Sequence, residues 1–319
     1  MCTSTVIIPT YNRPEHLAGV LDALALQAEP DAPFAVVVVD DGSTPPARLP
    51  DREWPFSLYV VRLPENRGRA AARNAALAHV ETPLVIFLDD DMRPQPGFVR
   101  AYAEAMASRT RTVGLGSVAF RPDIPRDRLT VYLETRGIAK LGASDPIPFK
   151  YFLTYNSAAP TDLLRAAGGF DERLRTWGGE DLELAWRLAK AGAEFVRVPD
   201  ARAYHAHRRT LEGLLEVSEA FARRSLPLIL ETHRELIPLL RADVFGPKRY
   251  AAQSESTRAS SWRRRAVRAL THAPFPGIVR LPISAWPGGP WPMRLFDYLI
   301  VSAWRKGLDG AKSLAEGAS

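Results

Sequence analysis

Short apolar runs alternate with helical repeats over the first 120 residues of the chain. The apolar runs are rich in β-branched residues and predict strands over 6–8, 34–39, 58–61, 84–88 and 112–120. Apolar residues spaced by three and four predict helices over 15–26, 69–79 and 98–108. Strands that alternate with helices predict an α/β fold, with a mostly parallel mixed sheet flanked by helices.

The alternation continues to about residue 210 and then stops. Helices are expected over 129–141, 161–167 and 181–191, and a strand is expected over 194–198. Residues 211–241 have a strongly helical pattern, and the chain from Trp262 onward mixes Arg, Trp, Pro and Gly with few acids. We therefore expect a domain over residues 1–210 and a mainly helical, basic, Trp-rich region over 211–319.

Composition sets broad limits on this prediction. Of 319 residues, 46% are hydrophobic and 24% are charged, which is ordinary for a globular protein. The single cysteine, Cys2, allows no disulfide within the chain, and no window approaches the ~18 apolar residues of a membrane span. No basic segment or long apolar run precedes the first strand, so we expect no secretory signal and a cytoplasmic location.

The run 84–88 ends in three acids, Asp89, Asp90 and Asp91. This pattern predicts a buried strand that delivers concentrated negative charge to the edge of a sheet. Adjacent carboxylates repel one another, so a hard divalent cation with oxygen ligands is expected there. A cation at a strand end of an α/β protein indicates a bound phosphate or diphosphate.

A second predicted strand, 34–39, is followed by Asp40, Asp41 and Gly42. A carboxylate at such an edge can accept hydrogen bonds from a nucleobase or a ribose. Taken alone, the same residues also fit a tight turn that follows a buried strand.

Residues 66–69 open a helix with a positive N-terminal end, and Arg73 follows Arg69 at a spacing of four. This arrangement is typical of an anion site. The alternative is an ordinary helix start with solvated arginines.

Gly178 and Gly179 precede Glu180 and Asp181 at the start of an amphipathic helix. A carboxylate there could act as a general base toward a hydroxyl group, although two acids at a helix start also fit favourable dipole chemistry. His205 follows the predicted strand 194–198; an imidazole there can ligate a metal, but surface histidines are commoner.

Six motifs occur in an order that resembles the family 2 glycosyltransferases, which share the Rossmann-like GT-A fold. The resemblance covers residues 5–207. Its motifs are Pro9-Thr10-Tyr11-Asn12-Arg13, Val39-Asp40-Asp41-Gly42-Ser43, the segment 65–74, Asp89-Asp90-Asp91, Gly168-Gly169-Phe170-Asp171-Glu172 and Gly179-Glu180-Asp181.

The resemblance implies roles for individual residues. A nucleotide-sugar donor would be bound in the half 1–120 by Pro9, Tyr11, Asp41, Gly68, Arg73, Asp89 and Asp90. In the half 121–210, Asp181, together with Glu180, matches the catalytic base motif. Asp89 and Asp91 would flank a metal, with Asp91 the more direct ligand, and His205 would complete the metal shell.

The implied activity is an inverting, metal-dependent sugar transfer to a hydroxyl acceptor. Carboxylate and imidazole ligands favour Mn²⁺ over Mg²⁺, although availability in the cell can override this. Processive relatives carry a Gln-x-x-Arg-Trp motif after the base, and this chain has none. We therefore expect non-processive transfer, to a cell-surface glycan or a lipid-linked precursor.

Residues 262–306 contain eight Arg or Lys residues against one acid, Asp297. Arg and Trp interleaved with short apolar runs suit an element that lies on the anionic inner face of a cytoplasmic membrane. A lid on the catalytic domain and an oligomer contact are the alternatives. No nucleic-acid-binding module accompanies the charge.

Two rival functions belong to other classes. A sugar nucleotidyltransferase would share the sheet and the metal, but it carries a Gly-rich, Arg-containing loop after the first strand, which residues 9–12 do not offer. The other rival is a catalytically silent scaffold with a membrane-binding or partner-binding tail. The joint presence of Asp89, Asp91, Asp181 and His205 argues against it.

Overall fold

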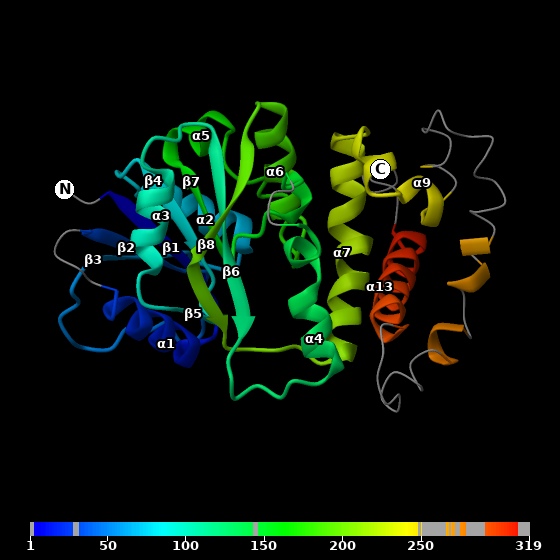
Figure 1. Ribbon diagram of the computed structural model, residues 1–319, viewed down its shortest axis with the longest axis horizontal. Helices are drawn as coiled ribbons and strands as arrows, with labels where there is room; N and C mark the ends of the chain where they lie inside the picture. The colour runs from blue at the N-terminus through cyan, green and yellow to red at the C-terminus, as the bar shows by residue number, and fades with distance from the viewer. Residues whose placement is uncertain are drawn as a thin grey trace. The chain divides into compact units, whose positions relative to one another are not determined.

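The computed structural model describes residues 3–27, 32–142, 146–247, 250, 266–267, 269–271, 275–278 and 291–311 (Figure 1). The chain divides into two compact units. The first consists of residues 1–175 and 180–208, and the second of residues 176–179 and 209–319. The sequence pattern places a boundary after residue 210, but it does not predict that residues 176–179 group with the second unit.

The first unit contains an eight-stranded sheet with the strand order β3-β2-β1-β4-β7-β6-β8-β5. The strands are β1 (Ser4–Thr10), β2 (Phe34–Asp40), β3 (Ser57–Arg62), β4 (Leu84–Leu88), β5 (Met92–Pro94), β6 (Thr112–Phe120), β7 (Asn156–Pro160) and β8 (Glu194–His205). The helices are α1 (Pro14–Ala25), α2 (Arg69–Ala78), α3 (Phe98–Met106), α4 (Arg128–Thr135), α5 (Thr161–Ala166) and α6 (Glu180–Lys190), with 3₁₀ turns η1 (Gly137–Lys140) and η2 (Phe149–Tyr151).

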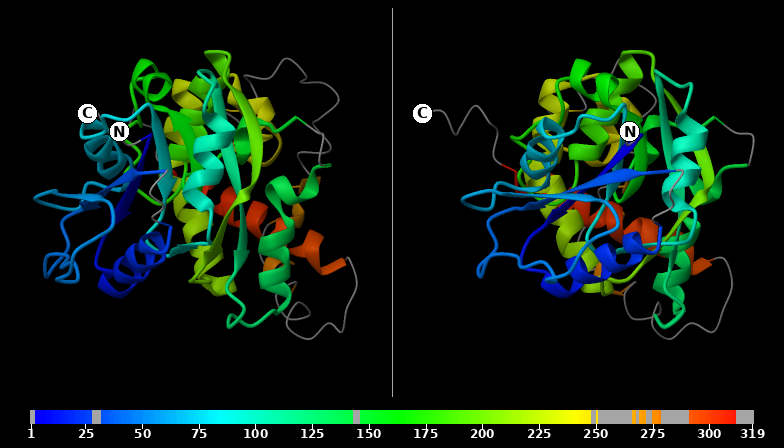
Figure 2. Two further views of the ribbon diagram at one scale, coloured as in Figure 1. Left: turned by 60° about the vertical axis from the view of Figure 1, so that its left-hand side comes forward. Right: turned by 90° about the vertical axis from the view of Figure 1, so that its left-hand side faces the viewer.

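The sheet is mixed, which confirms the predicted fold class. Strands β1 to β4 run parallel to their neighbours among themselves, and β6 runs parallel to β8. In contrast, β7 is antiparallel to both β4 and β6, and β5 is antiparallel to β8. Two further views show how the sheet twists from the N-terminal strands, in blue, to β6 and β8, in green (Figure 2).

Alternate residues of the central strands face two separate cores. Ile8, Val38 and Ile86 pack with α1 and α3 on one face of the sheet. On the other face, Val37 and Phe87 pack with α2, α5 and α6. Because the strands are buried on both faces, their sequences are continuous apolar runs, as expected for strands covered by helices.

The sequence pattern misses two strands and overextends two helices. The short strand β5 and the polar strand β7 have no apolar run of their own, so only their neighbours in the sheet define them. The helix expected over 129–141 ends at Thr135, because Gly137 adopts a left-handed conformation (φ 68°). The strand expected over 194–198 continues to His205, and the helix expected over 211–241 ends at Thr232.

The second unit is helical in the residues that the structure describes. Its main helices are α7 (Leu211–Thr232), α8 (Leu236–Leu239), α9 (Ala242–Phe245) and α13 (Trp291–Asp309). Trp304 of α13 packs against Phe221 of α7 and Phe245 of α9, with ring centroids 5.5 and 6.0 Å apart. This tryptophan therefore belongs to the interior contacts of the unit.

The predicted membrane-binding element over 262–306 lies partly outside the described residues. Trp262 and Trp286 are among the residues about which the structure says nothing. In the parts that are described, no helix combines the length and the apolar character needed to span a bilayer.

Replacement of Phe87 tests the core that α2 and α6 share. Phe87 is 1% exposed and contacts Phe152 and Phe170 edge-on. We expect Phe87→Ala to lower the free energy of unfolding by about 3–5 kcal/mol, because it leaves a cavity. Tyr59, on the edge strand β3, is 55% exposed. The control Tyr59→Ala should cost less than about 1 kcal/mol, as measured by urea denaturation. Equal costs would contradict the assigned core.

Candidate functional site

The candidate site lies where three parallel strands reach one edge of the sheet. β1 ends at Thr10, β2 at Asp40 and β4 at Leu88, and the acids 89–91 follow β4 directly. β1 lies between β2 and β4. From β1 the chain adds β2 and β3 on one side of β1, and it then returns to add β4 on the other side. Such a switch point at the carboxyl ends of strands is the usual ligand crevice of an open α/β sheet.

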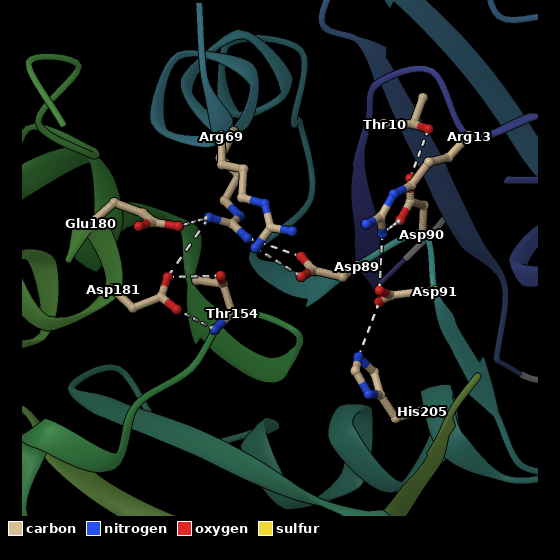
Figure 3. A network of polar contacts seen from close by, with 11 residues as sticks. Thr10, Arg13, Arg69, Asp89, Asp90, Asp91, Thr154, Glu180, Asp181 and His205 are labelled. Atoms are coloured by element: carbon tan, nitrogen blue, oxygen red, sulfur yellow. Dashed lines mark hydrogen bonds and ion pairs between the residues drawn. The ribbon is translucent and has the colours of Figure 1, made fainter. Parts of the chain in front are cut away.

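Pairing of β5 with β8 brings His205 to the acid run. Met92 lies opposite His205 in the register of these strands, and the Ala206 N–H donates to the Asp91 carbonyl oxygen at 2.7 Å. As a result, His205 Nε2 lies 3.3 Å from Asp91 Oδ1 (Figure 3). The predicted pair of metal ligands is therefore adjacent, although 114 residues separate them.

Arg13 lies between the second and third acids. Its guanidinium nitrogen is 3.4 Å from Asp90 Oδ1 and 3.0 Å from Asp91 Oδ2, and the Thr10 hydroxyl donates to Asp90 at 2.8 Å. Burial opposes ionisation of Asp91, but His205 and Arg13 together hold its pKa well below the usual range. Burial and the charge of Asp91 raise the pKa of Asp90 to about 6. Asp91 is therefore the more strongly ionised of the two.

Arg73 links the acid run to the start of α6. Its guanidinium lies 2.9 Å from Asp89 Oδ1, 3.0 Å from Glu180 Oε1 and 3.7 Å from Asp181 Oδ1. The side chain is only 1% exposed. Burial opposes its positive charge, but the three carboxylates together raise the pKa of Arg73 above its usual value. Arg69 adds a contact of 3.5 Å to Asp89.

Asp181 is held in the first turn of α6 by Thr154. The Thr154 hydroxyl donates to Asp181 Oδ1 at 2.8 Å, and its backbone N–H donates to Oδ2 at 3.3 Å (Figure 3). Burial and the neighbouring Glu180 raise the pKa of Asp181 to about 7. The Asp181 side chain keeps 17% of its surface exposed. It is therefore a carboxylate that a ligand can reach and that titrates near neutral pH.

Asp41 organises the start of α2. Its two carboxylate oxygens accept the backbone N–H groups of Arg67 at 2.8 Å and Gly68 at 2.9 Å. Gly42 (φ 75°) passes so close to the backbone of Glu65 that a Cβ atom there would lie 2.4 Å from it. The structure therefore supports the turn, which fixes the loop that leads to Arg69 and Arg73. A contact between Asp41 and a nucleobase or ribose stays a prediction.

The other predicted donor-binding residues lie at the same edge. Pro9 pairs with Val39 in the sheet, and Tyr11, directly after β1, is 43% exposed. Gly68 (φ 90°) lies at the start of α2, against the backbone of Arg175. Their contacts with a nucleotide stay predictions. Arg73 differs from the expected anion ligand, because its guanidinium is buried among protein carboxylates.

Asp91 and His205 offer the types of ligand that a divalent ion requires. Asp91 Oδ1 is buried and receives no hydrogen bond from any described residue, and the imidazole nitrogen lies beside it. Carboxylate oxygen with imidazole nitrogen suits Mn²⁺ and similar ions. Among the residues that the structure describes, no three His, Cys, Asp or Glu side chains form a metal-sized cluster. Asp89 in particular contacts arginines, so its role as a third ligand stays a prediction.

Two residues of the site, Arg13 and Thr154, were not predicted from the sequence. Arg13 stands in the first motif, Pro9-Thr10-Tyr11-Asn12-Arg13, but only the folded chain shows it between Asp90 and Asp91. Thr154 stands in a loop without any motif, and no feature of the sequence singles it out.

Comparison with known proteins identifies the family. The model of glycosyl transferase family 2 matches residues 5–158, and a model described as the N-terminal domain of galactosyltransferase matches residues 146–209. Residues 5–158 of this chain belong to glycosyltransferase family 2. The family assignment made from the six motifs is therefore confirmed.

Relatives at moderate identity include two bacterial glycosyltransferases. A pre-mycofactocin glycosyltransferase of Mycobacterium tuberculosis is 28% identical over 242 residues, which cover 74% of this chain and 49% of the relative. Validoxylamine A glucosyltransferase of Streptomyces hygroscopicus subsp. limoneus is 28% identical over 301 residues, which cover 82% of this chain and 64% of the relative. The chain thus spans only part of the length of these relatives.

Solved structures of the GT-A type share the fold. The mannosyltransferase PcManGT from Pyrobaculum calidifontis, in complex with GDP-Man and Mn²⁺, aligns with a TM-score of 0.60 and 23% identity, over 96% of this chain and 87% of its own. S. aureus TarS 1–349 with UDP aligns with a TM-score of 0.51 and 20% identity, over 99% and 92%. At these identities the likeness supports the fold alone, and it confirms the predicted GT-A fold.

Removal of the Arg73 charge tests the link between the two halves of the site. We expect Arg73→Met to lower the free energy of unfolding by about 3–5 kcal/mol, because it leaves buried carboxylates without their counter-charge. The matched control is Arg67→Met. Arg67 forms an exposed pair with Glu172 and should cost less than about 1 kcal/mol. Urea denaturation of both variants at pH 7.5 measures the difference. Similar costs would show that the carboxylates do not depend on Arg73.

Proposed function

We propose that this chain catalyses transfer of a sugar from a nucleotide-sugar donor to a hydroxyl acceptor, with inversion at the anomeric carbon. Family membership supports the reaction class. The observation that carries the proposal is that two kinds of group lie close together. Asp91 and His205 offer ligands for a divalent ion, and Asp181 is a partly exposed acid with a pKa of about 7.

Asp181 is assigned as the general base. A base works best when its pKa lies near the working pH, and burial beside Glu180 gives Asp181 a pKa of about 7. The acceptor hydroxyl gives its proton to an Asp181 oxygen while its own oxygen bonds to the anomeric carbon. The bond from that carbon to the diphosphate breaks, and the nucleoside diphosphate leaves with the electron pair. Attack from the face opposite the leaving group inverts the configuration.

The acid run is assigned to the donor diphosphate. Asp91 and His205 would hold the divalent ion, with Asp89 nearby, and a bound Mn²⁺ or Mg²⁺ neutralises charge that develops on a leaving diphosphate. Asp90 would stabilise the turn that presents Asp91, through its bonds from Thr10 and Arg13. Arg69, 35% exposed beside Asp89, is a cation that a phosphate oxygen can reach.

Substrate identity is proposed only by class. Solved neighbours of this fold have been captured with GDP-Man and Mn²⁺ and with UDP, so the donor proposed here is likewise a nucleoside diphosphate sugar. The acceptor proposed is a cell-surface glycan or a lipid-linked precursor on the cytoplasmic side of a membrane. The basic residues of 262–306 would favour such an anionic surface.

Asp181→Asn tests the base. We expect transfer to fall by about 10²–10⁴-fold, because the amide cannot take the acceptor proton. Wild-type activity should rise with pH through about 7, as Asp181 ionises. The measurement is release of nucleoside diphosphate from the donor that the wild-type protein uses, across pH 5.5–9.

Stability separates this loss from misfolding. In the folded chain the pKa of Asp181 is raised from the ordinary aspartate value of 3.8 to about 7, chiefly by burial. Between these values the native state binds more protons than the unfolded state, so this group lowers stability as pH rises through that window. Asp181→Asn should therefore be at least as stable as wild type at pH 8. Full activity in this variant would remove Asp181 as the base.

Asp91→Ala tests the donor site. Calorimetry with UDP-glucose, UDP-N-acetylglucosamine and GDP-mannose, each with and without Mn²⁺, should find one donor whose binding the ion strengthens. We expect Asp91→Ala to weaken that binding at least about tenfold, because a ligand to the ion is lost. Asp181→Asn serves as the control and should retain binding. Binding that is indifferent to both Mn²⁺ and Asp91 would refute the proposed metal site.

A further inference from the structure

We propose that Thr154 is a positioning residue for the base: its hydroxyl and its backbone N–H together fix the Asp181 carboxylate and favour its ionised, proton-accepting form. The inference rests on the proposed role of Asp181 as the base. It assigns a second residue to the reaction, one that lies outside all six motifs.

The two contacts grip both oxygens of one carboxylate. The hydroxyl donates to Oδ1 at 2.8 Å, and the backbone N–H donates to Oδ2 at 3.3 Å. Two donors on different oxygens prevent rotation of the carboxylate about its Cβ–Cγ bond. Each oxygen keeps a further lone pair, and 17% of the side chain stays exposed, so an acceptor hydroxyl still has a free site to approach.

The backbone around Thr154 is fixed on both sides. Two residues before it, Phe152 is 1% exposed and packs edge-on against Phe87 of β4 and against Phe195 of β8. Two residues after it, Asn156 pairs with Leu88, the last residue of β4 before the acid run. Thr154 itself is 1% exposed. The hydroxyl and the N–H of Thr154 are therefore held in place by contacts with β4, the strand that Asp89 follows. These contacts make Thr154 a rigid support for Asp181.

Other groups around Asp181 cannot replace this contact. The guanidinium of Arg73 lies farther away, at 3.7 Å, and is closer to Asp89 and Glu180. The Thr154 hydroxyl and the Thr154 backbone N–H both donate to Asp181. The ionisable groups that face Asp181 from its own and neighbouring elements are Glu180, Arg73, Arg69, Asp89 and Tyr155.

The balance of those groups explains why the hydroxyl matters. Burial and the charges of Glu180 and Asp89 disfavour a second negative charge at Asp181, whereas Arg73 and the Thr154 hydroxyl favour it. A hydrogen bond to the ionised form of an acid stabilises that form. Without the hydroxyl, a larger share of the carboxyl groups would carry a proton at neutral pH and could not act as base.

The test compares Thr154→Val, which keeps the shape and the backbone N–H but loses the hydroxyl, with Thr154→Ser, which keeps both donors. Aspartate labelled with ¹³C at the carboxyl carbon is incorporated, and the Asp181 signal is assigned by its loss in Asp181→Asn. We expect Thr154→Val to raise the pKa of Asp181 by about 1 pH unit, equivalent to about a tenfold change in the ionisation equilibrium. Thr154→Ser should leave it close to wild type. Thr154→Ala, which also lacks the hydroxyl, serves as a second variant if Val does not fold.

In the same variants, kcat/KM for release of nucleoside diphosphate is then measured as a function of pH. The donor is the one among UDP-glucose, UDP-N-acetylglucosamine and GDP-mannose that binds to the wild-type protein. We expect kcat/KM of Thr154→Val to be about tenfold lower below pH 7 and to approach wild type above about pH 9, with donor affinity unchanged. A purely structural role would lower activity by the same factor at every pH, and Ser would then give no selective rescue.

The outcomes separate this inference from the proposed function. An unchanged Asp181 titration and pH profile in Thr154→Val and Thr154→Ala, with Asp181→Asn inactive, would overturn the role of Thr154 and keep the base. An active Asp181→Asn would overturn both. A shifted titration that Ser restores, together with an inactive Asp181→Asn, supports both.

Discussion

The structure of the site depends on one buried guanidinium. Arg73, on α2, neutralises Asp89 at the end of β4 and Glu180 at the start of α6, and lies near Asp181. Three carboxylates could not share this buried volume without a cation, because each would otherwise take up a proton. One side chain therefore holds together the acids proposed for the donor and the base proposed for the acceptor.

The acids at this edge are differentiated by their neighbours. Arg13 and His205 keep Asp91 strongly ionised, whereas burial raises the pKa of Asp90 to about 6 and that of Asp181 to about 7. A strongly ionised carboxylate suits an ion, and one that titrates near neutral pH suits proton transfer. Groups of the same chemical type thus acquire different tasks from burial and partners alone.

Backbone contacts set this geometry as much as side chains do. Asp41 ties down the N–H groups of Arg67 and Gly68, and thereby places the helix that carries Arg69 and Arg73. Pairing of β5 with β8 aligns His205 with Asp91. The site is consequently a property of the sheet edge, and changes remote from the carboxylates can alter it through these two anchors.

The sequence by itself determined the strands that are buried on both faces, the α/β class, the family and the residues at the strand ends, because continuous apolar runs and ordered motifs are local signals. It could not reveal β5 or β7, since their short or polar sequences become strands only by pairing. It placed Arg73 in an anion site but could not show that the protein's own acids bury it. Thr154 and Arg13 reach the site through contacts with Asp181 and Asp91, which lie 27 and 78 positions away in the sequence. Such contacts arise from tertiary packing, which no local pattern encodes.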